Sequence, residues 1–325
     1  MSEVVLVTGA AGFIGSKVSE LLLSEGRQVI GIDNMNDYYD RRLKEWRLEP
    51  LKANSAFSFI EGDIGDMELI RGIFSENRID HVINLAARAG VRASVEDPWV
   101  YLDTNLKGTL NLLEASRMNG TETFILASTS SLYGFNEMPF SESQRTDSPL
   151  APYGATKKGA EVLCYSYHYL YKLNTIIPRY FTVYGPAGRP DMSIFKFILK
   201  IDKGTPIPVY GDGKQTRDFT YIDDIARGTV AMLGLKGYEI INLGNDNSVK
   251  LMYVINLIED ALGKKAVIDW QDRHPADVEA TWADIEKAKD LLGWRPEVKI
   301  EEGIERTVKW YRDNREFILS LREEK

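Results

Sequence analysis

Three glycines, each separated by two residues, follow the first apolar run of the chain. The run Val4–Val7 is rich in β-branched residues and is typical of a strand, and a segment with helical periodicity begins at Phe13. Gly9, Gly12 and Gly15 lie at the junction. Small residues there let the backbone approach a pyrophosphate that rests on the helix N-terminus. The order strand, glycine turn, helix indicates a dinucleotide-binding unit, although a plain strand-to-helix turn would give the same short pattern.

The next apolar run ends in an acid that supports this interpretation. Gln28–Ile32 leads into Asp33, about 20 residues beyond the glycines, where dinucleotide-binding folds place the acid that binds ribose hydroxyls. A carboxylate at this position repels a 2′-phosphate, so the sequence favours NAD over NADP. Arg41 and Arg42 keep the alternative open, because basic residues just beyond the acid can accept that phosphate.

Three more runs typical of strands alternate with helical segments. The strands are Phe57–Ile60, His81–Leu85 and Thr123–Ala127, and the helices lie near residues 66–76 and 98–118. Strands that alternate with helices indicate a parallel sheet whose ligands bind beyond the carboxyl ends of the strands. We therefore predict an α/β fold, a Rossmann-type doubly wound parallel sheet with a smaller mixed α/β substrate lobe.

The division into lobes is predicted from the loss of this alternation. Beyond residue 180 the elements become shorter and mixed, and no linker stands out. We expect an NAD-binding domain over residues 1–180 and a substrate lobe over residues 181–325, with some chain crossing back between them. Ile300–Leu321 has the pattern of one amphipathic closing helix.

Composition argues against several classes of partner. The net charge of −8 gives no reason to expect nucleic acid or an anionic membrane. One cysteine excludes an internal disulfide framework, and three scattered histidines argue against a Cys/His metal site. Without a basic leader region or an apolar run long enough to span a bilayer, the chain is expected to be cytoplasmic.

Tyr153 and Lys157 form a candidate catalytic pair. They are four residues apart in a segment opened by Pro152, which suits the first turn of a helix and places both side chains on one face. A nearby ammonium favours the phenolate and lowers a tyrosine pKa from its ordinary value of about 10. Tyr210 and Lys214 have the same spacing, but the glycines between them indicate a turn. Taken alone, the pair would also fit an ordinary exposed helical tyrosine.

Polar and small residues follow the predicted strand ends. Thr129 and Ser130 come just after the fifth strand; a hydroxyl-rich loop would explain them, but beside the Tyr–Lys pair they are candidates for the remaining catalytic hydroxyls. Asp63 follows the third strand and is placed to meet the adenine amino group. Leu85–Ala87 ends the fourth strand with small residues that would admit the cofactor.

In combination, these motifs resemble the extended short-chain dehydrogenase/reductase family, in its sugar-nucleotide epimerase branch. The resemblance rests on the glycine turn, Asp33, Asp63, the stretch 127–134 and Tyr153-x-x-x-Lys157, and it extends over essentially the whole chain. It implies a tightly bound NAD, a tyrosinate that takes the proton of a sugar hydroxyl, and a bridging threonine or serine. It also implies a lysine that orients the nicotinamide ribose and lowers the tyrosine pKa.

Residues 129–131 indicate the branch of chemistry. By resemblance, 4,6-dehydratases carry an Asp-Glu pair there and glucuronate decarboxylases carry a glutamate, whereas this chain has Ser130 and Ser131. Without an added acid, nothing is positioned to remove a proton from C5 of the ketosugar. The resemblance therefore implies an isomerase that epimerises C4.

Five segments resemble the UDP-glucuronate 4-epimerases of that branch, namely residues 34–40, 89–92, 179–186, 188–192 and 217–221. The implied reaction interconverts UDP-glucuronate and UDP-galacturonate through a transient 4-keto sugar and bound NAD. The alternatives are a 4-epimerase of neutral UDP-hexoses (UDP-glucose/UDP-galactose or their N-acetyl forms), a UDP-glucuronate decarboxylase, and a catalytically silent NAD-binding regulator.

Three positions depart from the expected pattern. Arg88 stands where that subgroup often has glutamine, and Ala187 replaces a bulkier residue; both bear on which sugar fits. Pro178 lies inside the predicted strand Thr175–Phe181 and lacks an N–H, so we expect an edge strand or a bulge there.

The resemblance also assigns the two ends of the site. Arg189 is the candidate cation for a C6 carboxylate, with Arg217 on the diphosphate, Asp277 on the uridine ribose and Tyr210 near uracil. The expected substrate contacts are Gly90, Arg92, Thr129, Ser130, Thr182, Val183, Arg189, Tyr210, Arg217 and Asp277. The expected cofactor contacts are Gly9, Gly12, Phe13, Ile14, Gly15, Asp33, Asn34, Asp63, Ile64, Leu85, Ala86, Ala87, Asn105, Tyr153, Lys157 and Tyr180.

Two helical segments carry long apolar stripes, residues 98–118 and 153–172. Core packing accounts for much of each stripe. In the family that the chain resembles, these helices form a four-helix interface between two subunits, so a homodimer is expected.

Overall fold

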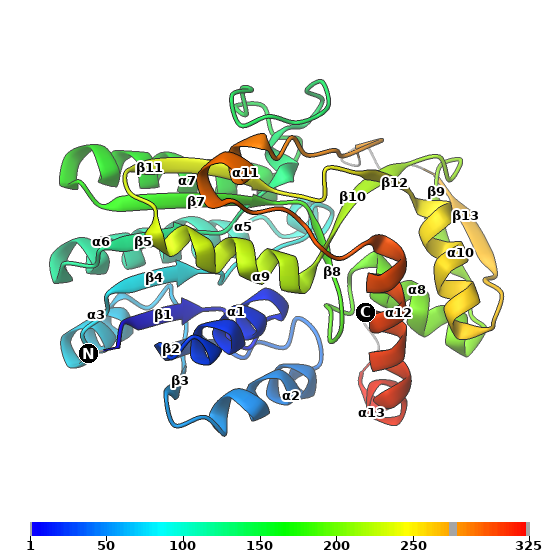
Figure 1. Cartoon of the computed structure of the whole chain (residues 1–325), viewed down its shortest axis with the longest axis horizontal. Coiled ribbons are helices and arrows are strands. Elements are labelled where there is room, and N and C mark those ends of the chain that lie inside the picture. The colour runs from blue at the N-terminus through cyan, green and yellow to red at the C-terminus, as the bar shows by residue number, and fades with distance from the viewer. Residues whose placement is uncertain (1, 273–277, 323–325) are drawn as a thin grey trace.

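The computed structural model describes residues 2–272 and 278–322 (Figure 1). Its large sheet is wholly parallel, with the strand order β11-β7-β5-β4-β1-β2-β3, and β6 continues the line of β5 against β7. The strand order reverses at β1, which lies between β2 and β4. The strands are β1 Val4–Thr8, β2 Gln28–Asp33, β3 Phe57–Glu61, β4 His81–Asn84, β5 Thr123–Leu126, β6 Ser128–Thr129, β7 Asn174–Tyr180 and β11 Tyr238–Leu243.

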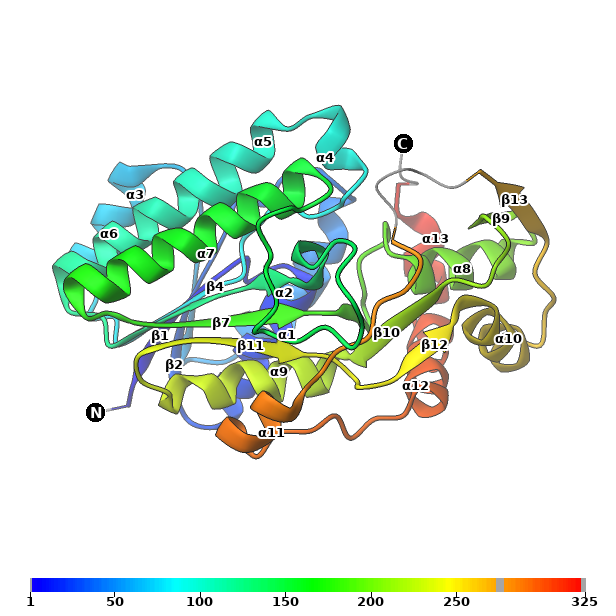
Figure 2. The ribbon, with the colours of Figure 1, turned by 90° about the horizontal axis from the view of Figure 1, so that it is seen from above.

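Helices cover both faces of this sheet, as Figure 2 shows. On one face lie α1 Phe13–Ser24, α2 Arg41–Lys52 and α9 Ile222–Ala231; on the other lie α3 Met67–Glu76, α6 Thr109–Asn119 and α7 Pro152–Tyr171. A hydrophobic core lies on each face of the sheet, and alternate residues of β1 belong to one or the other. Val5 and Val7 pack toward the first set of helices, and Leu6 packs toward the second. The predicted α/β fold with a Rossmann-type doubly wound sheet is confirmed.

The predicted helix near residues 98–118 has a more complex form. It consists of α5 Trp99–Tyr101, a π-helical segment Leu102–Gly108 and then α6. The short helix α4 Ala93–Glu96 precedes it. π-helical turns are rare and often occur near functional sites, and this one contains the predicted site residue Asn105.

The second part of the chain builds two small sheets and returns once to the large one. Strands β8 Thr182–Tyr184, β10 Thr216–Tyr221 and β12 Ser248–Lys250 form one small sheet, and β9 Ile207–Tyr210 pairs with β13 Ile268–Gln271. Around them lie α8 Ser193–Lys203, α10 Leu251–Leu262, α12 Ile300–Asp313 and α13 Arg315–Ser320, while α11 Glu286–Leu292 lies beside β11 (Figure 1). None of the helices in the described part of the chain has both the length and the apolar character needed to cross a membrane.

Two expectations need correction. The closing segment is two helices, because the chain breaks at Asn314 between α12 and α13. Pro178 is not on an edge strand, since β7 lies between β5 and β11. It falls in the gap between the pairing of β7 with β5, which ends at Ile176, and its pairing with β6, which begins at Arg179. The missing N–H therefore costs no bond of the ladder on that side.

A buried ion pair fixes α7 to the sheet. Glu161 of α7 and Arg179 of β7 are both almost fully buried, and Arg179 donates from Nε and Nη2 to the two carboxylate oxygens at 3.0 and 2.9 Å. The Ser128 hydroxyl of β6 donates to the same carboxylate at 2.6 Å. This network joins the helix that carries Tyr153 to the strand end that carries Thr129.

Removing the cation from this network will strongly destabilise the fold. Arg179→Met leaves the Glu161 carboxylate buried without its partner, so we expect the free energy of unfolding to fall by about 3–5 kcal/mol. Arg71→Met, which removes an exposed arginine paired with Glu68 within one helix, is the control and will cost less than about 1 kcal/mol. Denaturant titrations measure both values, and similar losses for the two variants would contradict this account.

Candidate active site

A cavity of about 380 Å³ lies beyond the carboxyl ends of the parallel strands, at the reversal of strand order around β1. This is where open α/β sheets bind ligands. Most of the predicted site residues line it: Gly9, Gly12, Phe13, Ile14, Gly15, Asp33, Asn34, Asp63, Ile64, Leu85, Ala86, Ala87, Gly90, Thr129, Ser130, Tyr153, Lys157, Tyr180, Thr182, Val183 and Arg189.

The glycine turn is packed so closely that side chains are excluded. A Cβ on Gly15 would lie 2.0 Å from the carbonyl oxygen of Gly9, and one on Gly9 would lie 2.8 Å from the backbone nitrogen of Ala86. Gly9 also has φ +68°, a left-handed conformation that glycine adopts readily. The turn therefore presents bare backbone at the N-terminus of α1, which suits a pyrophosphate.

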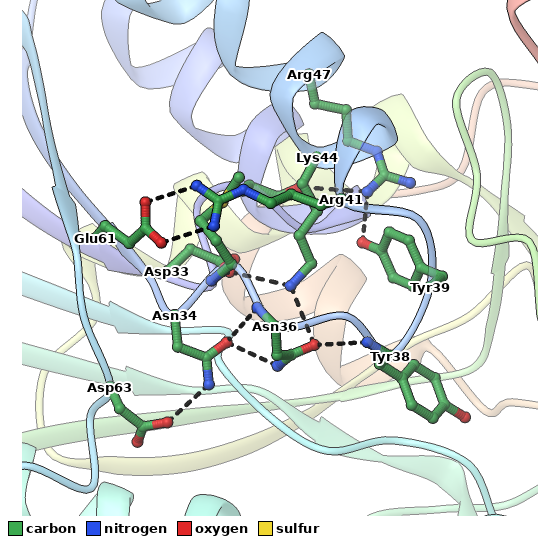
Figure 3. A network of polar contacts seen from close by, with 12 residues as sticks. Asp33, Asn34, Asn36, Tyr38, Tyr39, Arg41, Lys44, Arg47, Glu61 and Asp63 are labelled. Carbon is green, nitrogen blue, oxygen red and sulfur yellow. Dashed lines mark hydrogen bonds and ion pairs between the residues drawn. The ribbon is translucent and has the colours of Figure 1, made fainter. Parts of the chain in front are cut away.

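Polar side chains gather at the end of β2 and β3 (Figure 3). Asp33 is buried, and its Oδ1 accepts from the backbone N–H of Met35 at 2.9 Å and from Nζ of Lys44 at 3.2 Å. Asn34 donates from Nδ2 to Asp63 at 2.7 Å. Lys44, a buried cation of α2 that lines the cavity, was not predicted from the sequence.

Arg41 and Arg42, which could have accepted the 2′-phosphate of NADP, bind other partners. Arg41 binds both carboxylate oxygens of Glu61 at 2.9 and 2.8 Å (Figure 3). Arg42 binds Asp40 and the carbonyl oxygen of Ser320. Both guanidinium groups are thus held by carboxylates of the protein. The carboxylate of Asp33 faces the cavity, which favours free ribose hydroxyls over a 2′-phosphate.

The predicted catalytic pair lies on α7, and each member is shaped by burial. Lys157 is buried, which lowers the pKa of its ammonium to about 8, and its Nζ donates to the carbonyl oxygen of Ala127 at 2.7 Å. Burial raises the pKa of the Tyr153 phenol, whereas a hydrogen bond with the Thr129 hydroxyl and the charge of Arg189 lower it. These two groups oppose the effect of burial, but the pKa of the phenol stays raised, and the Lys157 ammonium, which was predicted to lower it, donates to a carbonyl oxygen.

Two arginines of the cavity wall flank Tyr38. The guanidinium of Arg88 lies 4.5 Å from the ring centroid of Tyr38, and that of Arg189 lies 5.8 Å from it. Arg189 also donates from Nε to Asp191 at 2.9 Å and from Nη2 to the second oxygen of the same carboxylate. The cavity wall thus carries Arg88 and Arg189 beside Tyr38, and Lys44 beside the acid Asp33.

Arg217, Arg92 and Tyr210 lie outside this cavity. Arg217 lines a neighbouring cavity of about 210 Å³ together with Ser130 and Thr182, and its guanidinium donates to backbone carbonyl oxygens at residues 216, 278 and 279. The Arg92 guanidinium lies 3.7 Å from the ring centroid of Tyr210. This stack joins the loop before α4 to the end of β9, across the two parts of the chain.

Asn105 does not line the cavity either, and it supports the cavity from behind. It is buried, its Oδ1 accepts from the backbone N–H of Arg88 at 2.9 Å, and its Nδ2 donates to the carbonyl oxygen of Arg88 at 3.0 Å. Asn105 therefore fixes the loop that presents Arg88. The predicted residue Asp277 lies outside the described residues.

Comparisons with known proteins agree with this geometry. The family model described as GDP-mannose 4,6 dehydratase matches residues 6–307. A protein named UDP-glucuronate 4-epimerase from Thermodesulfobacterium geofontis is 56% identical over 318 residues, which cover 98% of each chain.

Solved structures give the same result. The crystal structure of UDP-glucuronic acid 4-epimerase from Bacillus cereus in complex with UDP-glucuronic acid and NAD has a TM-score of 0.91 and 39% identity, and the match covers 95% of this chain and 99% of that one. UDP-glucose 4-epimerase from Thermotoga maritima with UDP-glucose has a TM-score of 0.87 and 33% identity, covering 96% and 99%. The chain therefore belongs to the GDP-mannose 4,6-dehydratase family of short-chain dehydrogenase/reductases.

Proposed function

We propose that the protein is an NAD-dependent isomerase that interconverts UDP-glucuronate and UDP-galacturonate by epimerisation at C4. The observation that carries the proposal is the meeting of Tyr153, Thr129 and Arg189 in the cavity that begins at the glycine turn. The relatives named UDP-glucuronate 4-epimerase, one of them solved with UDP-glucuronic acid and NAD, support the choice of substrate.

The residues of the cavity fit a dinucleotide. The bare backbone of the glycine turn suits the pyrophosphate, Asp33 suits the adenosine ribose, and Ala86 and Ala87 leave room beside them. When bound, NAD supplies the reversible oxidation of the sugar at C4. We assign Lys157 to the nicotinamide ribose, since its buried ammonium reaches the cavity next to Tyr153.

Tyr153 moves the proton of the C4 hydroxyl. Its phenolate takes the proton as C4 is oxidised and returns it after the sugar has turned over, so one base serves both faces of the ring. The Thr129 hydroxyl stabilises the phenolate by a hydrogen bond, and Ser130 lies next to it on the cavity wall.

The distribution of acids argues against elimination of water, which needs a base at C5. Among the described residues that line the cavity, the acids are Asp33 and Asp63, and both lie at the end of β2 and β3. Ser130 and Ser131 occupy the wall near Tyr153. Without a carboxylate there, no strong base is positioned to remove the C5 proton.

Arg88 and Arg189, which flank Tyr38 in the cavity wall, favour an acidic sugar. A carboxylate that leaves water needs charged or hydroxyl donors, and Arg189, Thr182, Thr129 and Ser130 supply them in our proposal. Arg88 adds a second cation beside Tyr38. The second candidate is a 4-epimerase of neutral UDP-hexoses, because a relative named UDP-glucose 4-epimerase shares 33% of the sequence.

The nucleotide end of the substrate is assigned to the second part of the chain. Arg217 would bind the diphosphate, and Tyr210 with Arg92 would lie near the uridine. Strong contacts to UDP and weaker contacts to the sugar suit a reaction in which the ketosugar must rotate about its link to phosphate. Arg217 lines the cavity that adjoins Ser130 and Thr182, which supports this direction of binding.

We further propose a homodimer. Large apolar side chains are exposed on the outer face of α7 and on the helices before it, with exposed fractions from 52% to 73%. They are Trp99, Met118, Val162, Tyr165, Tyr169 and Leu170. Exposed apolar side chains of this kind are typical of an interaction site, and pairing two copies of α7 would cover those on this helix.

The protein will convert UDP-glucuronate to UDP-galacturonate in the presence of NAD. A proton NMR time course will show galacturonate signals that grow to a steady ratio, and Tyr153→Phe will slow this by at least about 100-fold because the base is lost. Turnover of UDP-glucose alone would favour the neutral-sugar epimerase. Release of CO₂ with a UDP-pentose product would favour a decarboxylase.

Loss of the Thr129 hydroxyl will move the pH profile upward. Thr129→Val removes a hydrogen bond that lowers the Tyr153 pKa. Because the phenolate is the active form, the pH of half-maximal kcat will rise by about one pH unit, since a hydrogen bond to a charged group contributes about 1.5 kcal/mol. Thr182→Val is the control and will leave this midpoint in place. An unchanged midpoint in Thr129→Val would contradict the assignment.

Light scattering will give twice the chain mass of 36.8 kDa. Charges placed on the exposed face of α7, in the variant Val162→Glu with Tyr169→Glu, will halve the measured mass. Val267→Glu changes an exposed valine far from this face in sequence and will leave the mass unchanged. A monomer mass for the unmodified protein at micromolar concentration would exclude the proposed dimer.

A further inference from the structure

Arg47 of α2 links the glycine turn to the loop that carries Arg189. It is buried, and its guanidinium donates from Nε and Nη2 to the carbonyl oxygen of Ala187 at 3.0 and 2.7 Å. Nη2 also donates to the carbonyl oxygen of Gly188 at 3.0 Å. Nη1 donates to the carbonyl oxygen of Ala11 in the glycine turn at 3.3 Å.

Tyr39 completes this set of contacts. Nη1 of Arg47 donates to its hydroxyl at 2.7 Å, and the guanidinium carbon lies 5.4 Å from the ring centroid (Figure 3). Arg47 lies one helical turn beyond Lys44, on the buried side of α2. The same helix face therefore contacts the ribose-binding acid through Lys44 and the Arg189 loop through Arg47.

The loop before Arg189 depends on an external contact for its shape. Ala187 has φ +53°, in the left-handed region that residues with a Cβ disfavour. The carbonyl oxygens of Ala187 and Gly188 point to Arg47, and buried carbonyl groups need such donors. Arginine suits this task because its planar fork can bind several acceptors at once, whereas lysine cannot.

A shift of this loop would be passed on to the guanidinium of Arg189. Arg189 follows Gly188 directly, and its Nε and Nη2 are bound to Asp191, two residues further along. These bonds to Asp191 fix the position of the guanidinium relative to the backbone of its own loop. The backbone itself is held against α2 by Arg47.

We propose that Arg47 is a positioning residue for carboxylate recognition, which holds the 187–188 backbone so that Arg189 points into the cavity. This inference rests on the proposed function in one respect, the assignment of Arg189 to the sugar carboxylate. Arg47 touches neither sugar nor reacting atoms; it acts through Arg189. Its contact with Ala11 means that loss of Arg47 also disturbs the glycine turn, so cofactor content must be followed separately.

A double-mutant cycle tests this role. The variants are Arg47→Met, Arg189→Ala and the two combined, with Arg42→Met as the control, since Arg42 is an exposed arginine on the same helix. Calorimetry at saturating NAD gives Kd for UDP-glucuronate and for UDP, which lacks the carboxylate. Bound NAD and the thermal unfolding midpoint are measured for every variant.

If Arg47 positions Arg189, Arg47→Met will raise the Kd for UDP-glucuronate by about tenfold or more and will change the Kd for UDP by less than about twofold. In the Arg189→Ala background the same change will have almost no further effect, because the group that it positions is absent. Arg47→Lys will fall in between, and Arg42→Met will match the unmodified protein.

Equal losses of UDP-glucuronate affinity with and without Arg189, or equal losses for UDP, would show a merely structural role and overturn the inference. The inference would also be overturned if Arg189→Ala left the ratio of the Kd values for UDP-glucuronate and UDP unchanged. Failure of the proposed function has a different signature, namely an unmodified protein that binds UDP-glucuronate but does not epimerise it. In that case the binding cycle still decides the role of Arg47.

Discussion

The buried ion pair between Glu161 and Arg179 sets the relation between helix α7 and the strand ends of the large sheet. Because Ser128 donates to the same carboxylate, the strand that leads to Thr129 is held against the helix that presents Tyr153. A buried charge pair of this kind is costly to form unless its hydrogen bonds are satisfied, and Arg179 has further partners in Tyr133 and Thr146. The hydroxyl and the phenol of the active site meet because this network is complete.

The chemistry then follows from where charge is placed in one buried cavity. Burial raises the pKa of the Tyr153 phenol, and Thr129 and Arg189 oppose this effect. The acids that line the cavity, Asp33 and Asp63, lie at the ends of β2 and β3, where Asp33 is paired with Lys44, and Arg88 and Arg189 flank Tyr38. A base beside C4 without a second base for C5 disfavours elimination and leaves reduction of the ketosugar on either face, which is the requirement for a 4-epimerase.

Local patterns in the sequence predicted most of the fold and much of the site. The strands, the glycine turn and Asp33 were found because each depends on residues close together in the chain. Lys44 and Arg47 were missed, although they share a helix face with the buried Leu48 and Leu51, a pattern that marks buried cations.

Contacts between distant segments could not be predicted in the same way. Arg47 donates to the carbonyl oxygen of Ala187, which lies 140 residues further along the chain. Lys157 was predicted to lower the pKa of Tyr153, but its ammonium donates to Ala127, and the groups that oppose the effect of burial on this pKa are Thr129 and Arg189. Pro178 was expected on an edge strand or at a bulge, and a local gap in the ladder lets an interior strand accept it.

The central claim is that only C4 of the sugar reacts, and an exchange experiment tests it most directly. UDP-glucuronate is incubated with the protein and NAD in D₂O until epimerisation reaches equilibrium, and both sugars are then examined by proton NMR. The account predicts full retention of the protons at C4 and C5, because the hydrogen of C4 is returned internally and no base reaches C5. Loss of the C5 signal to deuterium in either sugar would reveal a second base and contradict the account.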